Sequence, residues 1–100
     1  MCNNSRVWKL NEDIVVYYYH FYKLNGLIYK SLKQIVDKLG IDIQSFNIRE
    51  QNLMYVLTNG RQGLSNPATQ TVEVANLFEY ARQNDENFQV NLSKIVNRII

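Results

Sequence analysis

Residues able to perform acid–base or nucleophilic chemistry are scarce in this chain. It contains one histidine, His20, and one cysteine, Cys2, with no CxxC motif and no His/Cys cluster at metal-ligand spacing. An activated nucleophile needs a base within hydrogen-bond reach, and a structural zinc site needs four ligands, which are mostly His or Cys. The sequence therefore predicts no enzyme activity, no bound metal and no cofactor.

One glycine-containing run invites comparison with phosphate-binding loops. It reads Gly60-Arg61-Gln62-Gly63. A nucleotide-binding loop, however, follows a strand and carries a lysine and a hydroxyl that are missing here. A turn is the favoured interpretation, from which Arg61 can reach the phosphate backbone of a nucleic acid.

Six ring-bearing side chains follow one another in the run Tyr-Tyr-Tyr-His-Phe-Tyr at residues 17–22. Such rings can stack on unpaired bases. At helical spacing, however, Tyr18, Phe21 and Tyr22 fall on the core side of a helix, which favours packing. The rings left for solvent or a partner are Tyr17, Tyr19 and His20.

The composition is that of one folded domain. The chain has 100 residues, of which 46% are hydrophobic and 20% charged, enough to bury a core. A net charge of +2 neither requires nor excludes nucleic acid. The longest apolar run, residues 14–22, is too short and too polar to cross a bilayer, and no signal sequence is recognisable. We therefore expect a single soluble, cytoplasmic domain over residues 1–100, without a membrane contact.

Hydrophobic periodicity predicts five helices and no strand. The first begins at Asn11 as N-cap, before two acidic residues, and ends at Asn25-Gly26. The second covers about 27–39, and the third begins at Asp42 and ends at residues 58–60. The last two have apolar stripes at Val74, Leu77, Phe78 and Ala81, then at Phe88, Leu92, Ile95 and Ile99, with Asp85 capping the fifth.

These elements predict an all-α, compact five-helix domain with a central helix-turn-helix-like unit. Gly40 separates the second helix from the third, as the turn of such a unit requires. Residues 8–66 would form the unit with its following loop, and residues 67–100 the two C-terminal helices. In a helix-turn-helix the second helix is presented to the major groove of DNA.

The third helix has two distinct faces. Phe46 and Leu53 point to the interior, whereas the opposite side carries amides and an isoleucine. Amides pair with adenine and aliphatic groups contact the thymine methyl, so this face can read bases of duplex DNA. The residues expected at bases are Gln44, Ser45, Asn47, Ile48, Arg49 and Asn52, and those expected at phosphates are Lys30, Lys33, Lys38 and Arg61.

The same surfaces also fit a protein partner such as a nuclease, because tyrosine is enriched at interface centres and lysine is not. The residues of this alternative interface are Tyr17, Tyr19, His20, Gln51 and Tyr55. The outward residues, or the apolar end at Ile99-Ile100, can also support a homodimer.

Several positions together resemble a known family. They are Trp8, residues 11–13, Leu39-Gly40, Ser45, Arg49, Asn52 and the run Gly-Leu-Ser-Asn at 63–66. They are similar to the N-terminal helical domain of bacterial HNH-type restriction endonucleases. In those proteins a tryptophan and an acidic helix start precede a leucine-glycine turn, a serine–basic–asparagine helix and a glycine-leucine-small-asparagine loop. The resemblance covers roughly residues 8–80.

The resemblance implies a helix-turn-helix-like module that helps to place a DNA-cutting domain on its target, with Ser45, Arg49 and Asn52 in the recognition helix. This chain departs from the family: it has no HNH motif after residue 80, and Ile41-Asp42 replaces an arginine beside the turn glycine, which removes a phosphate contact. Asn52 also fits a structural role, tying the helix end to the following loop. A free-standing module of this type fits a small DNA-binding regulator, or a mobile-element product that blocks a host defence nuclease.

Overall fold

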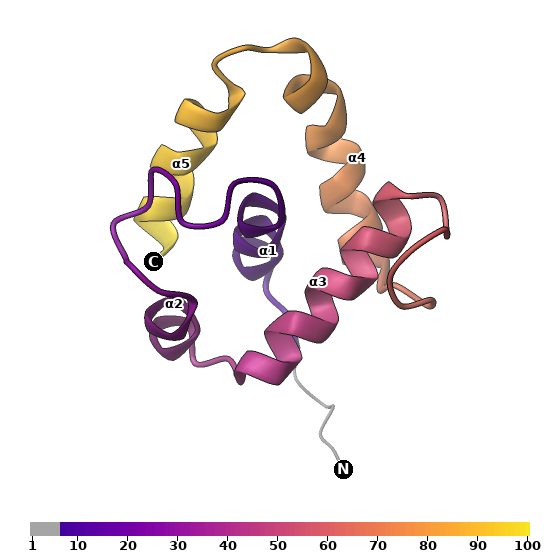
Figure 1. The fold of residues 1–100 in the computed structure, drawn as a ribbon, viewed down its shortest axis with the longest axis horizontal. Helices are drawn as coiled ribbons and strands as arrows, with labels where there is room; N and C mark the ends of the chain where they lie inside the picture. The colour runs from indigo at the N-terminus through magenta and orange to yellow at the C-terminus, as the bar shows by residue number, and fades with distance from the viewer. Residues whose placement is uncertain (1–6) are drawn as a thin grey trace.

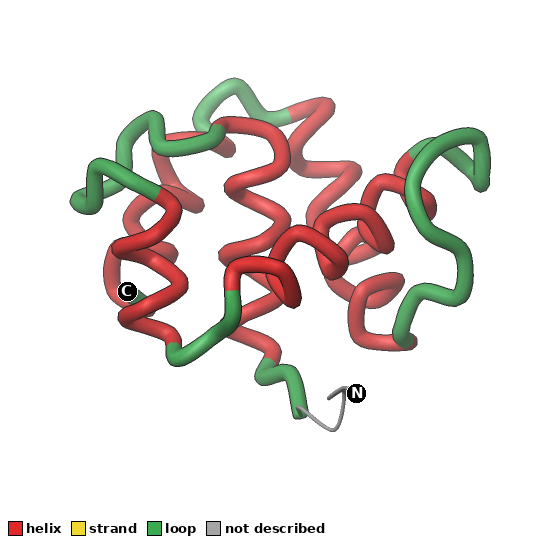
Figure 2. The backbone as a smooth tube through the Cα atoms, turned by 60° about the horizontal axis from the view of Figure 1, so that its bottom comes forward, coloured by secondary structure: helices red, strands yellow, loops and turns green. Residues whose placement is uncertain are grey.

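The computed structural model describes residues 7–100, and every regular element in this range is a helix. Figure 2 shows the helices joined by loops, with no strand among the described residues. The helices are α1 Leu10–Tyr22, α2 Leu32–Leu39, α3 Ile43–Leu57, α4 Thr69–Asn84 and α5 Phe88–Ile99. The predicted all-α, five-helix fold is therefore confirmed for the described part of the chain.

Helix α1 is the centre of the molecule. Figure 1 shows it nearly end-on, with the other four helices arranged around it. Residues 12–18 are all buried, and Tyr17 and Tyr18 have 0% of their surface exposed. A helix that is apolar all round is an interior helix. The prediction that Tyr17 faces solvent or a partner was therefore wrong, because residues 12–18 of α1 are covered on every side.

The start of α3 follows its sequence signal. The Asp42 carboxylate accepts hydrogen bonds from the backbone N–H groups of Gln44 and Ser45, at 3.0 and 3.3 Å. This side chain satisfies two of the donors that a helix N-terminus leaves unpaired. Gly40, with a φ of 72°, ends α2 in the left-handed conformation, and only three residues separate the two helices.

Three other helix starts differ from the prediction. Helix α2 begins at Leu32, because the Ser31 side chain accepts a bond from the Gln34 N–H and caps it there, which leaves residues 27–31 as a loop. Helix α1 begins two residues earlier than predicted, because its N-cap is Lys9 and not Asn11. Helix α5 follows Asn87, whose N–H bonds the Asp85 carboxylate outside the helix.

The apolar stripes of α4 and α5 are narrower than predicted. Leu77 is 61% exposed and Ile95 is 45% exposed, so neither belongs to the core. On α5 the buried residues are spaced by four, and they are Phe88, Leu92, Val96 and Ile100. Since Ile100 is buried, the apolar C-terminal end packs within this chain.

The loop after α3 folds back onto that helix. The Leu64 N–H donates to the Gln51 carbonyl oxygen at 3.1 Å. A Cβ atom added to Gly63 would lie 2.2 Å from the same oxygen, and the Gly63 φ is +89°. Only glycine therefore allows residues 61–66 to lie against the second half of α3.

This contact predicts a large effect of Gly63→Ala on stability. The substitution should lower the free energy of unfolding by about 3 kcal/mol or more, from the left-handed backbone and the clash together. Gly40→Ala is the matched control, because Gly40 is also left-handed but an added Cβ would have nothing within 4 Å. It should cost only about 1–2 kcal/mol. Urea denaturation of both variants measures the difference, and equal losses would contradict the proposed contact.

Candidate nucleic-acid interface

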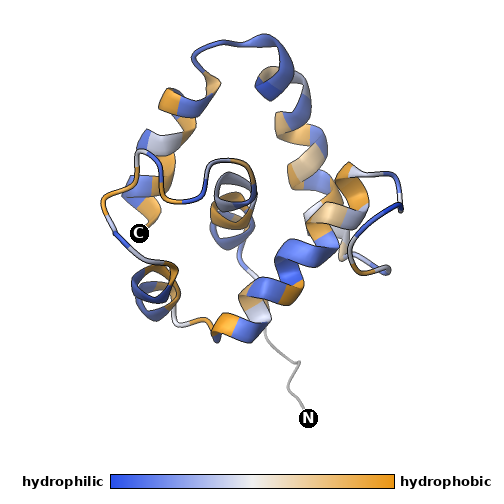
Figure 3. Cartoon of the chain, viewed as in Figure 1, coloured by the Kyte–Doolittle hydropathy of each residue, from blue (hydrophilic) through white to orange (hydrophobic). Residues whose placement is uncertain are grey.

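The exposed face of α3 is polar and open. Gln44, Asn47, Ile48 and Gln51 follow the spacing of one helix face and are all exposed, whereas Phe46 and Leu53 are buried. The predicted orientation of the helix is thus confirmed. Within the described residues, no protein hydrogen bond engages the side-chain amides of the three polar residues. Figure 3 shows hydrophilic colouring along the middle of α3 on the side turned to the viewer.

Arg49 does not belong to this open face. Its Nε and Nη2 atoms each donate to a different carboxylate oxygen of Asp13, both at 2.7 Å. Its guanidinium also lies over the Trp8 ring, 4.8 Å from the centroid. The Arg49 side chain is 11% exposed and that of Asp13 is 3% exposed. The prediction that Arg49 contacts bases was therefore wrong, because Nε and Nη2 bond a buried carboxylate and the side chain is only 11% exposed.

The Asp13–Arg49 pair is the centre of a cluster that joins three helices. The Gln70 side-chain amide, at the start of α4, donates to Asp13 at 2.6 Å and to the Trp8 carbonyl oxygen at 3.0 Å. Trp8, Asp13 and Arg49 were part of the sequence resemblance, and they meet here. Their shared role is to fix α3 and α4 against α1.

Other predicted residues of α3 are only partly available. Ser45 and Asn52 are half-buried, and no side-chain hydrogen bond of Asn52 lies within the described residues. The tie from α3 to the loop, expected from Asn52, is made by the Gln51 carbonyl. The Tyr55 ring is half-buried beside Gly60, where an added Cβ would lie 3.3 Å from the ring.

Basic side chains are exposed in the segments that precede and follow α3 in the chain. Lys30, Lys33 and Lys38 are exposed on or just before α2, and Arg61 is exposed in the loop that follows α3. Lys33 pairs with Asp37 at 2.6 Å, but both side chains are more than half exposed, so the pair is weak and can open. The helix spans about 22 Å at 1.5 Å per residue, which separates Arg61 from the lysines.

The aromatic surface predicted on α1 is not formed. Tyr17 is buried and donates to Glu79 at 2.6 Å, and burial together with this bond raises the pKa of its hydroxyl. Tyr19 is half-buried with its ring edge-on to Phe46. His20 is half-buried and bonds Glu50 through Nδ1 at 3.2 Å. The alternative protein interface is therefore contradicted at Tyr17 and reduced at the other two positions.

Two carboxylates near these rings are held in their charged form. The hydrogen bond from His20, aided by Lys23 at 3.5 Å, holds the pKa of Glu50 below its usual value. The hydrogen bonds from Arg82 do the same to the pKa of Glu79. Glu50 lies on the flank of α3, and its negative charge is partly offset by its partners within the protein. It therefore opposes an approaching phosphate less than a free carboxylate would.

None of the protein-family models, curated proteins or solved structures compared with this chain matches it. Over residues 7–100, no helix combines the length and hydropathy of a membrane span. The same residues hold no group of three His, Cys, Asp or Glu side chains placed to share a metal ion. The open face of α3 and its basic surroundings therefore remain the candidate site, on its own geometry.

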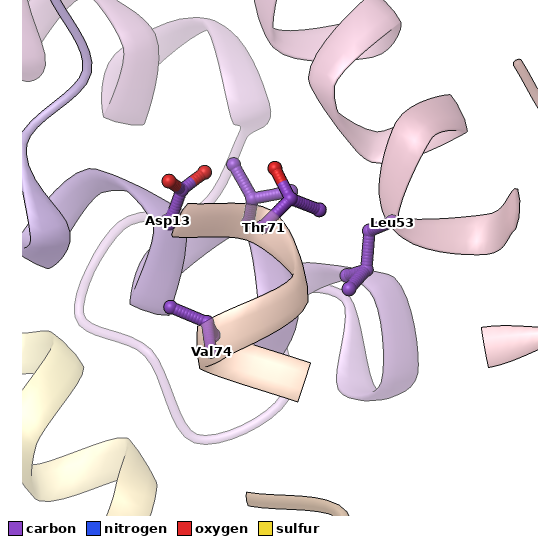
Figure 4. A pocket seen from close by; sticks show the side chains of 5 residues that line it. Asp13, Leu53, Thr71 and Val74 are labelled. Atoms are coloured by element: carbon purple, nitrogen blue, oxygen red, sulfur yellow. The ribbon is translucent and has the colours of Figure 1, made fainter. Parts of the chain in front are cut away.

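A narrow cavity lies beside the ion pair, where α1, α3 and α4 meet (Figure 4). It is too narrow for a water molecule, and its lining comprises Asp13, Val16, Leu53, Thr71 and Val74. The Thr71 hydroxyl oxygen is buried there with no hydrogen-bond partner. A buried polar group without a partner destabilises the folded state.

Replacing this hydroxyl with a methyl group should stabilise the protein. Thr71→Val keeps the side-chain shape and removes the unpaired oxygen, so we expect the free energy of unfolding to rise by about 1 kcal/mol. Thr69→Val, at an exposed position of the same helix, serves as control and should change little. Chemical denaturation measures both, and a destabilised Thr71→Val protein would show that the hydroxyl is bonded in solution.

The buried ion pair makes a second prediction. Arg49→Met leaves the Asp13 carboxylate buried and unpaired, which should lower the free energy of unfolding by about 3–5 kcal/mol. Adding Asp13→Asn removes the stranded charge while keeping an oxygen for Gln70, and should restore roughly 2 kcal/mol or more. Thermal and urea denaturation of the single and double variants measure the recovery. A double variant no more stable than Arg49→Met would contradict this assignment.

Proposed function

We propose that this chain is a non-catalytic module that binds duplex DNA through the exposed face of α3. The observation that carries the proposal is the open row of unpaired amides and Ile48, with exposed basic side chains in the segments before and after the helix. Amides and aliphatic groups suit base edges in the major groove. Lysine and arginine side chains suit the phosphates on either side.

In the proposed complex, α3 enters the major groove and α2 lies across the phosphate backbone. The short turn at Gly40 suits the two-helix unit that this mode of binding needs. Lys33 and Lys38, exposed on α2, are placed ahead of the α3 N-terminus and would contact phosphates. The N–H groups at that terminus are not free for a phosphate, because Asp42 already accepts from two of them.

The sequence resemblance to a DNA-placing domain of HNH-type nucleases supports the same class of partner. The proposed DNA contacts differ from those that the resemblance implies, because Arg49 is bound to Asp13. Gln44, Asn47, Ile48 and Gln51 take its place. As a module of this kind, the chain would act as a DNA-binding regulator or as part of a restriction or anti-restriction system.

The alternative is an inhibitor that binds a host defence nuclease through α1 and through Gln51 and Tyr55 of α3. It has less support on α1, whereas Gln51 is exposed and Tyr55 is half-buried. Of its predicted residues, Tyr17 is fully buried, and Tyr19 and His20 are half-buried. Interface anchors must be able to enter a pocket of the partner, which a buried ring cannot do.

The proposal predicts a salt-dependent affinity for duplex DNA that depends on the lysines of α2. The double variant Lys33→Gln/Lys38→Gln should bind a short labelled duplex more weakly. The slope of log K against log salt should become less steep by about 2, because two phosphate contacts are lost. Fluorescence anisotropy over a series of salt concentrations measures both quantities.

The control is Lys94→Gln, which removes an exposed lysine from α5 and should leave affinity and slope unchanged. Absence of salt-dependent binding by the parent chain would overturn the proposed function.

A further inference from the structure

We propose that α3 selects A·T base pairs in the major groove; this inference rests on the DNA-binding function proposed above. The reading side chains are those of the open face, which carries three amides and one aliphatic group. They are Gln44, Asn47, Ile48 and Gln51. The inference follows from which base contacts this set of groups can make and which it cannot.

The face lacks the usual reader of guanine. Arginine and lysine, bidentate to the guanine O6 and N7 atoms, make the commonest specific contact in the major groove. The only basic residue of α3 is Arg49. The Nε and Nη2 edge of its guanidinium bonds Asp13 at 2.7 Å, and the guanidinium lies over the Trp8 ring. Arg49 is thus withdrawn from the surface, and guanine has no cationic partner on this helix.

The three amides instead match adenine. Adenine offers an N7 acceptor and an N6 donor side by side, and an amide offers an N–H donor and a carbonyl acceptor in the same arrangement. Guanine offers two acceptors, so an amide facing it leaves its carbonyl oxygen unpaired. The side-chain amides of Gln44, Asn47 and Gln51 have no protein partner among the described residues and are free to pair.

Ile48 adds a contact to the partner base. This residue is 54% exposed and lies in the middle of the amide row. Thymine carries a methyl group at the major-groove edge, which an aliphatic side chain contacts favourably, and cytosine carries none. Adenine and thymine are therefore both matched by neighbouring residues of one face.

The length of the face sets the size of the site. From residue 44 to residue 51 the helix rises about 10 Å, which corresponds to about three base pairs at roughly 3.4 Å each. One copy of the chain should therefore select a core of about three A·T pairs, and flanking pairs should contribute mainly through their phosphates.

The test compares three labelled duplexes with identical flanks and different cores, containing A·T, G·C or inosine·cytosine pairs. Inosine·cytosine presents the major-groove edge of G·C and the minor-groove edge of A·T, so it separates the two grooves. The parent chain should bind the A·T core at least about tenfold more tightly than the other two. Anisotropy at a fixed salt concentration gives the three affinities.

Base and protein changes can then be combined. Replacing thymine by uracil in the core removes the methyl group and should lower the affinity of the parent by about fourfold. The affinity of the Ile48→Ala variant should not change with this replacement. Replacing adenine by 7-deazaadenine removes N7 and should weaken binding by the parent more than binding by Gln44→Ala/Asn47→Ala, which keeps only the Gln51 amide. Asn76→Ala, which removes an exposed amide from α4, is the matched control and should behave like the parent.

The outcomes separate this inference from the proposed function. Equal binding to all three cores, or tighter binding to G·C, would overturn A·T selection while leaving duplex binding in place. If the A·T and inosine·cytosine cores are bound equally well, and both more tightly than G·C, the bases are read in the minor groove. That result would also overturn A·T selection by α3 in the major groove. If no duplex is bound at any salt concentration, the DNA-binding function itself fails.

Discussion

The position of α3 depends on one buried ion pair, between Asp13 of α1 and Arg49. Two charges taken out of water are stable together only when their hydrogen bonds are well formed. Here two parallel bonds at 2.7 Å join them, and Gln70 supplies a further donor to Asp13. Because the pair has one favourable geometry, it fixes the rotation of α3 about its own axis. The residues that α3 shows to solvent follow from that rotation.

The same pair determines the chemistry of the exposed face. Arg49 is the one basic side chain in α3, and in holding Asp13 it leaves a face of amides and Ile48 without charge. Positive charge is supplied instead by α2 and by the loop after α3. A separation of this kind, with charges at the edges and uncharged hydrogen-bonding groups between them, suits a surface that tracks phosphates and reads bases.

The sequence predicts α3 well because its signals are local. Asp42 caps it, Gly40 ends the helix before it, and the positions of Phe46 and Leu53 distinguish its two faces. Helix α1 was less predictable, since a helix surrounded by others has no polar side. The spacing of its apolar residues therefore does not show which of them face solvent. The role of Arg49 was also hidden, because its partner lies 36 residues away along the chain. The positive charge of an arginine does not by itself show whether the side chain binds a phosphate or a buried carboxylate.

The loop after α3 limits the exposed face at its other end. Gly63 lies so close to the Gln51 carbonyl that no other residue fits without a backbone shift, and the Leu64 N–H bonds that carbonyl. The second half of α3 is therefore covered where Tyr55 packs beside Gly60. What stays open runs from Gln44 to Gln51, between the segment of the α2 lysines on one side and this loop on the other. In the proposed complex the ligand contacts this face and also the basic side chains before and after α3, which a duplex groove with its two phosphate rows can do.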